Sequence, residues 1–233
     1  NREAHACPEL VTSEVVRRAG AVDVVVAHAD MDGLLSAVKF LRGGEQPWPE
    51  ADEDARAADS PGRGHALSAR GRLLQDALGE AQASLRSKQR ETLRQEVLAA
   101  LVALPRPMPP ALQTRLEELA RNHAATLAPA EALAAQAREE ASGVLVVRAG
   151  KDLGRTLKKE LLFLLEERAK VGVVIEGNAI TAATFREDID LARCDALSAG
   201  RSDYRFAQVT DGGAAIIAQL GRLASEAGQA RSG

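Results

Sequence analysis

The chain has 233 residues, 45% of them hydrophobic, which is enough to bury a substantial core in one large domain or two smaller ones. With 30 basic and 33 acidic residues, the net charge of -3 excludes an overall positive field, so any nucleic-acid binding needs a local basic patch. Aromatic residues make up only 3%, which argues against single-strand recognition on many stacking platforms.

The cysteines and the apolar runs indicate where the protein resides. Cys7 and Cys194 lack the spacing of metal ligands, so we expect two free thiols and a cytoplasmic location. No apolar run reaches the length of about 18 residues that a membrane span needs, and the N-terminus lacks a signal-peptide pattern. Because the sequence starts at Asn1, we expect a trimmed chain or the ordered part of a longer one.

The first 44 residues read as helix, strand and helix. Residues 9 to 19 have an amphipathic pattern that ends at Gly20. The valine-rich run from 22 to 27 predicts a buried strand, and apolar residues at helical spacing predict a helix over 34 to 42. We expect Gly33 to provide the tight turn between them.

Three chemically reactive side chains lie at the end of the predicted strand. His28, Asp30 and Asp32 are spaced by two, and side chains with that spacing project from the same face of an extended backbone. One imidazole and two carboxylates in this arrangement predict a divalent metal site. The alternative is structural: Asp30 and Asp32 are turn and N-cap residues, and His28 is a strand-end histidine.

The middle of the chain predicts a loop followed by helices. Residues 44 to 64 are rich in proline, glycine and acid, which is typical of a solvated loop, and Trp48 is expected to anchor it by packing. Residues 66 to 104 carry two apolar stripes at helical spacing. Two alanine-rich helices follow, over 111 to 126 and 130 to 141, the second with Pro129 near its first turn.

The pattern changes after residue 142, where we place a domain boundary. Strands are predicted over 143 to 150 and 171 to 177, with a helix between them. A further strand follows the turn at Gly177 and Asn178. Alternating strands and helices with one hairpin indicate a second α/β domain.

A second candidate site lies at residues 197 to 213, before a clear terminal helix. Gly212 and Gly213 let backbone amides approach a phosphate at the start of that helix, and Arg201 and Arg205 are able to add fork-shaped contacts. The structural alternative is a turn with a surface arginine.

The N-terminal motif resembles a known family. His-x-Asp-x-Asp-Gly after a hydrophobic strand, here in AHADMDGLLSA, is similar to the first motif of the DHH phosphoesterases. That family includes single-strand exonucleases, oligoribonucleases, cyclic-dinucleotide phosphodiesterases and inorganic pyrophosphatases. The resemblance implies hydrolysis of phosphoesters or phosphoanhydrides with Mn²⁺ or Mg²⁺ as cofactor.

The C-terminal part resembles the DHHA1 substrate-binding domain that follows many DHH domains. Its glycine-rich signature is matched in order, with Ala199 in place of a glycine and two extra residues of spacing. The resemblance implies that the matching residues bind substrate. They are Gly200, Arg201, Asp203, Ala207, Gln208, Gly212 and Gly213.

The chain departs from the DHH pattern after the first motif. Asp59 stands where the second aspartate motif is expected, but the sequence has no Asp-His-His triplet, and His65 is the nearest candidate for it. A two-metal centre needs several protein ligands for each ion, so a complete dinuclear site is not expected. A single hard-cation site from His28, Asp30, Asp32 and Asp59 is consistent with the residues present.

We therefore expect an α/β protein of three parts. A shortened DHH-like parallel-sheet domain occupies 1 to 65, a helical segment 66 to 141, and a smaller DHHA1-like α/β domain 142 to 233. The leading hypothesis is a metal-dependent phosphoesterase for nucleotides or short single-stranded nucleic acid, with Asp30 and Asp32 catalytic. The alternative is an inactive relative that binds a ligand or docks a partner, or a second copy, through its helices.

Overall fold

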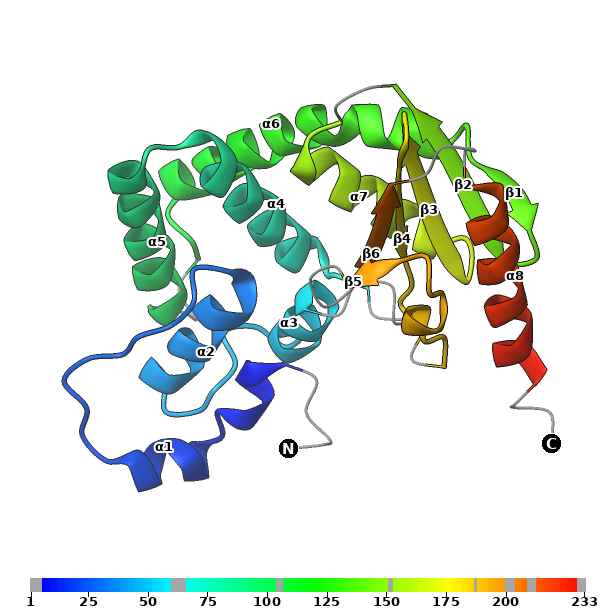
Figure 1. Cartoon of the computed structure of the whole chain (residues 1–233). Helices are drawn as coiled ribbons and strands as arrows, with labels where there is room; N and C mark the ends of the chain where they lie inside the picture. Colours follow the sequence, from blue (N-terminus) through cyan, green and yellow to red (C-terminus); the bar gives the residue numbers. More distant parts are fainter. Residues whose placement is uncertain are drawn as a thin grey trace. The chain divides into compact units, whose positions relative to one another are not determined.

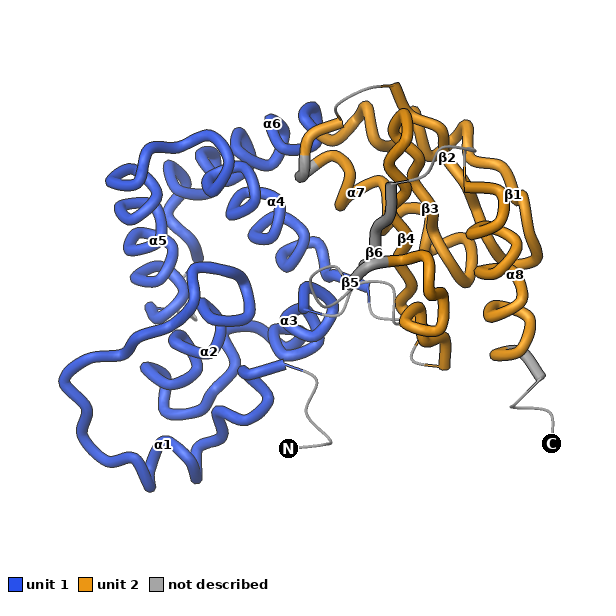
Figure 2. The backbone as a smooth tube through the Cα atoms, viewed as in Figure 1, with its two compact units in different colours: residues 1–126 blue, residues 127–233 orange. Residues whose placement is uncertain are grey.

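The computed structural model describes residues 6–59, 66–103, 107–150, 153–186, 188–199, 204–208 and 213–229. The chain is a mixed α/β protein with two compact units, residues 1–126 and 127–233 (Figures 1 and 2). The second unit begins ahead of the boundary expected near 142, because the end of a long helix and one more strand pack with its sheet. No helix in the described ranges has the length and apolar character to cross a membrane.

The regular elements in the described part of unit 1 are all helices. It begins with a short 3-10 helix, η1, and continues with six α-helices, of which the last extends into unit 2. The elements are η1 (Cys7–Leu10), α1 (Ser13–Ala19), α2 (Met31–Leu41), α3 (Ala51–Asp59), α4 (Ala69–Ser84), α5 (Ser87–Val102) and α6 (Pro110–Ala134).

Side-chain caps set the helix starts in unit 1. Thr12 accepts a hydrogen bond from the Val15 N–H before α1, and Ser68 accepts one from the Gly71 N–H before α4. The two predicted apolar stripes on α4 and α5 face one core, shared with α2 and the first half of α6. Its fully buried side chains include Met31, Leu35, Leu74, Leu93, Leu101 and Leu116.

The parallel sheet expected in residues 1 to 65 is not present in the described part of unit 1. Residues 22 to 27 form no strand there, and Val24 and Val26 are exposed. A strand needs a neighbour to pair its backbone N–H and C=O groups, and the described part of unit 1 contains no other strand. The β-propensity of the valines alone is therefore not enough to form one.

Two other expectations from the middle of the chain are corrected. The predicted loop contains helix α3, on which Asp54 is fully buried, and Trp48 packs as an anchor, as expected. The two alanine-rich helices are one continuous helix, α6, with Pro129 in its interior. Residues 138 to 141, expected to be helical, form an edge strand instead.

Unit 2 contains a six-stranded sheet in the order β1-β2-β3-β4-β6-β5. The β2 and β3 strands are parallel, and the other neighbours are antiparallel. The strands are β1 (Arg138–Ala141), β2 (Val144–Ala149), β3 (Val171–Glu176), β4 (Ala179–Ala183), β5 (Ser198–Ala199) and β6 (Tyr204–Gln208). The helices are α7 (Arg155–Glu166), the 3-10 helix η2 (Leu191–Arg193) and α8 (Ala214–Gln229).

The sheet of unit 2 is covered on both faces. Alternate residues of β3 enter different cores: Val173 packs in the cluster that contains α8, and Val174 in the cluster that contains α7 and the end of α6. Burial on both faces explains the continuous apolar run of this strand. The predicted strands, the helix between them, the hairpin at Gly177 and the terminal helix are confirmed.

Candidate functional site

Asp30 is the N-cap of helix α2. Its carboxylate accepts a hydrogen bond from the Gly33 N–H at 2.9 Å, and its backbone lies in the extended region. Asp30 therefore satisfies one of the free N–H groups at the start of the helix. This is the structural alternative that the sequence left open for this residue.

Asp32 lies in the first turn of α2, where it meets the N-terminal 3-10 helix. Its Oδ1 atom accepts a hydrogen bond from the Cys7 backbone N–H at 3.0 Å. Burial raises the pKa of the Asp32 carboxyl, hydrogen bonds from Cys7 oppose this change, and the negative charges of Asp59 and Asp30 raise it further. The charges of Asp30 and Asp59 therefore act on the Asp32 carboxyl in the same direction as its burial.

The same carboxylates also affect the pKa of the Cys7 thiol. Its pKa is raised by its hydrogen bond to Asp32 and by the charge of Asp32, with further contributions from burial and from Asp59 and Asp30. The sequence provided no sign of this contact, because Cys7 and Asp32 are 25 positions apart and only the fold brings them together.

His28 lies near the carboxylates, but its side chain is 91% exposed. Its Nδ1 atom is 3.9 Å from Oδ2 of Asp30, which is beyond hydrogen-bond distance. Its backbone packs against Gly33, where an added Cβ would lie 2.5 Å from the His28 carbonyl oxygen. Gly33 is therefore inside the helix and permits this close approach, rather than forming the predicted turn.

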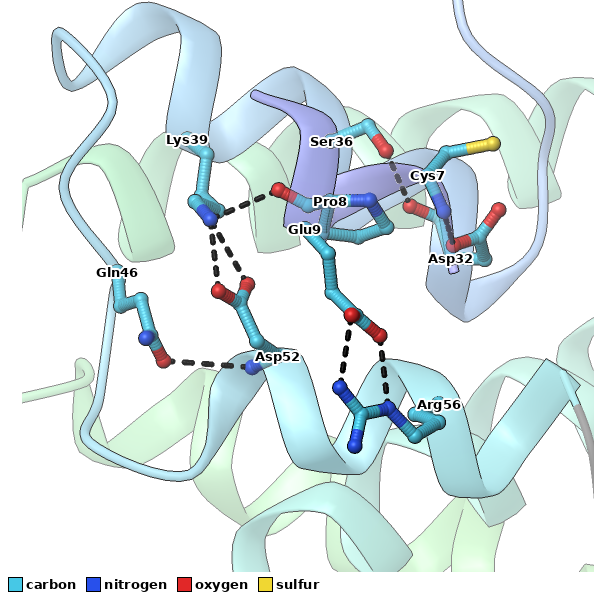
Figure 3. A network of polar contacts seen from close by, with 9 residues as sticks. All are labelled: Cys7, Pro8, Glu9, Asp32, Ser36, Lys39, Gln46, Asp52 and Arg56. Carbon is cyan, nitrogen blue, oxygen red and sulfur yellow. Dashed lines mark hydrogen bonds and ion pairs between the residues drawn. The ribbon is translucent and has the colours of Figure 1, made fainter. Parts of the chain in front are cut away.

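A polar network fixes the position of α2 against its neighbours (Figure 3). The buried Lys39 ammonium on α2 donates to the Pro8 carbonyl at 2.7 Å and to both oxygens of Asp52 on α3. Arg56 on α3 forms a two-point ion pair with Glu9 on η1. These contacts tie η1, α2 and α3 together, and Asp32 and Asp59 lie on two of these elements.

A second polar anchor holds α3 to the start of α4. The buried Asp54 carboxylate accepts from Trp48 Nε1 at 2.7 Å and from the Ser68 N–H and Oγ, each at 2.6 Å. The proline-, glycine- and acid-rich composition of this segment had predicted a solvated loop. The signal that identifies it is the buried Trp48, whose indole N–H needs an acceptor.

The described side chains do not form a coordination sphere. Among them, no group of three or more His, Cys, Asp and Glu side chains is placed to hold one metal ion. The strand on which His28, Asp30 and Asp32 were expected to converge is not formed, and Asp30 and Asp32 make the backbone contacts given above. The donor chemistry suits a hard divalent cation, but these positions do not bring the donors together.

The second candidate site falls largely outside the described residues. This is the case for Gly200, Arg201, Asp203 and Gly212, as it is for His65 in unit 1. Gln208 is the last residue of β6, and Gly213 precedes α8 with a φ of 77°. The Gly213 carbonyl accepts a hydrogen bond from the Ile217 N–H, so the expected helix start is confirmed at this position.

No protein-family model and no curated protein matches the chain. Two solved structures resemble it in part. The pGpG-specific phosphodiesterase PggH from Vibrio cholerae has 9% identity and a TM-score of 0.49, with 75% of this chain and 67% of that chain covered. The exonuclease RecJ, bound to manganese, has 14% identity and a TM-score of 0.34, with 91% of this chain and 57% of that chain covered.

At these identities and TM-scores, neither structure assigns a family or an activity to this chain. The residues that bear on function are therefore the chain's own. The first of these are Asp30 and Asp32 at the start of α2, with Asp59 at the end of α3.

Proposed function

We propose that unit 1 binds a divalent cation, Mn²⁺ or Mg²⁺, through Asp30, Asp32 and Asp59, with His28 as a further ligand. The single observation that supports this most strongly is the placement of Asp30 and Asp32 at the start of α2, where repulsion from the charges of Asp59 and Asp30 adds to burial in raising the pKa of Asp32. A bound cation would relieve that repulsion, and carboxylate oxygens are the ligands that these metals prefer.

Binding would require a rearrangement at the start of α2. Asp30 and Asp32 remain anchored by the helix, whereas His28 is exposed at the end of a segment that belongs to no helix or strand. Movement of His28 toward the carboxylates would complete the donor set. This movement is part of the proposal.

We further propose that the protein is a metal-dependent phosphoesterase for nucleotides or short single-stranded nucleic acid. In this proposal Asp30 and Asp32 are the catalytic residues, and the metal supplies a polarised water and charge neutralisation when bound. In unit 2, Arg201, Gly212 and Gly213 would bind a substrate phosphate at the start of α8, where backbone N–H groups and the helix dipole favour an anion.

The test is hydrolysis of a short oligonucleotide and of a cyclic dinucleotide by the purified chain with Mn²⁺. We expect turnover that EDTA abolishes and that Asp32→Asn reduces at least a hundredfold without loss of folded structure. Glu53→Gln, an exposed change on α3, serves as the matched control and should retain full activity. Unchanged turnover in Asp32→Asn would remove Asp32 from the catalytic site.

A second candidate is a non-catalytic relative that binds a nucleotide or docks a partner. Two observations favour it: the sequence contains no Asp-His-His triplet, and no three-ligand group is formed among the described side chains. Saturable binding of the cyclic dinucleotide without turnover at any Mn²⁺ concentration would support this candidate. Absence of both binding and turnover would overturn both.

A further inference from the structure

The exposed apolar side chains of the described residues are concentrated in one part of unit 1. All the large ones lie between residues 10 and 41, and four belong to a single run. That run comprises Val22, Val24, Val25 and Val26, with Val24 75% and Val26 90% exposed. A contiguous group of exposed apolar residues is a more frequent feature of interaction surfaces than of the rest of a protein surface.

The backbone of the same run has no hydrogen-bond partner among the described residues. Residues 21 to 27 lie between the end of α1 and the start of α2, in no helix or strand. The first tertiary hydrogen bond after them is the one that Gln82 donates to the Ala29 carbonyl at 2.6 Å. A run of valines with unpaired backbone groups is able to form a strand when a partner strand is supplied.

We propose that residues 22 to 27 pair with the same segment of a second copy of this chain, as two antiparallel strands about a two-fold axis. An isologous contact of this kind closes with two subunits. It would hold these residues in the extended form that the sequence predicts, and it satisfies backbone groups on both copies at once.

Charge complementarity supports a second copy in this orientation. Arg17 and Arg18 are exposed before the segment, and Asp30 and Asp32 follow it. Antiparallel pairing brings the basic end of one copy toward the acidic end of the other. Parallel pairing in register would instead place Asp23 beside Asp23 and arginine beside arginine.

The most symmetric register places Val25 opposite Val25 of the second copy. Val24 then lies opposite Val26, so the two most exposed valines are paired. Asp23 lies opposite Ala27, which keeps the two aspartates apart. This register predicts a cross-link at Val25 and none at Asp23, whereas parallel pairing in register would allow both.

The first test is the concentration dependence of the mass of the purified full chain by sedimentation equilibrium. We expect twice the 24.6 kDa of one chain at about 100 µM. Val24→Lys/Val26→Lys should raise the dissociation constant about tenfold or more, because two apolar side chains are lost from the contact. Val15→Lys, an exposed change on α1, should leave it unchanged.

The second test is a disulfide cross-link in a Cys7→Ser background. Val25→Cys should form a covalent dimer on mild oxidation, because facing residues in paired strands lie within disulfide distance. Asp23→Cys should not, since two such residues would be about 14 Å apart in this register. A monomer at all concentrations, a double-lysine variant that dimerises as tightly as the original chain, or equal cross-linking at both positions would each overturn the proposal. None of these outcomes depends on metal binding or hydrolysis.

Discussion

The carboxylate of Asp30 accepts a hydrogen bond from the Gly33 N–H, so the aspartate proposed to bind a metal also starts helix α2. The structural role and the proposed metal role make different demands. Capping needs a short side chain with an oxygen acceptor, whereas cation binding needs the negative charge.

Substitutions at Asp30 should separate the two roles. Asp30→Ala removes the cap and should lower the free energy of unfolding by about 1 kcal/mol, measured by urea denaturation. Asp30→Ser keeps a capping oxygen and should retain nearly all of that stability, yet lose Mn²⁺ affinity. If Asp30→Ser binds Mn²⁺ as tightly as the original chain, Asp30 caps the helix and is not a metal ligand.

Asp32 should make the stability of the protein depend on pH. Its pKa is raised above the ordinary value of 3.8, mainly by burial, so the fold favours the protonated form. The resulting stabilisation is present below the unfolded-state pKa and is lost as the pH rises through the raised pKa. Asp32→Asn keeps an acceptor for the Cys7 N–H and removes the charge, so it should reduce this loss as the pH rises above the unfolded-state pKa.

Asp76 on α4 provides the matched control for this experiment. Its pKa is also raised by burial, while His123 and Arg72 oppose the change. Asp76→Asn should therefore flatten the same pH profile without any effect on Mn²⁺ binding. A profile that is identical in Asp32→Asn and the original chain would contradict the assigned burial of the Asp32 charge.

Asp54 should be among the most sensitive positions of unit 1. Asp54→Ala leaves the Trp48 indole N–H and the Ser68 N–H without their acceptor in a buried place, which we expect to cost about 3 to 5 kcal/mol. Trp48 is the only tryptophan, so its fluorescence follows unfolding directly.

The neighbouring Glu53 gives the comparison, since Glu53→Gln is exposed and should change stability by less than about 0.5 kcal/mol. Gly71→Ala should behave like Asp54→Ala, because its Cβ would lie 2.3 Å from Cγ of Asp54. An Asp54→Ala variant with an unchanged free energy of unfolding would show that this anchor contributes little to stability.

The sequence predicted unit 2 well because its signals are local. The run from Val171 to Ile175 is apolar on both faces, and the sheet buries both faces. Gly177 at a φ of 56° makes the hairpin that the Gly-Asn pair predicted. The 3.6-residue spacing of α8 likewise follows from its own residues.

The same reasoning failed for residues 22 to 27, because strand formation depends on a distant partner. Six residues rich in valine resemble β3, but the described part of unit 1 contains no strand with which they could pair. The contact between Cys7 and Asp32 could not be predicted from the sequence either, because it depends on how η1 packs against α2. The candidate site was predicted as a set of residues, but its geometry was not.

Mn²⁺ titration followed by electron paramagnetic resonance tests the central claim most directly, because free and bound Mn²⁺ differ in signal intensity. We predict one saturable site in the original chain and an affinity at least tenfold weaker in both Asp32→Asn and Asp59→Asn, with Asp76→Asn unchanged. Equal Mn²⁺ affinity in all four proteins, or no saturable site in the original chain, would contradict the claim that these carboxylates form a cation site.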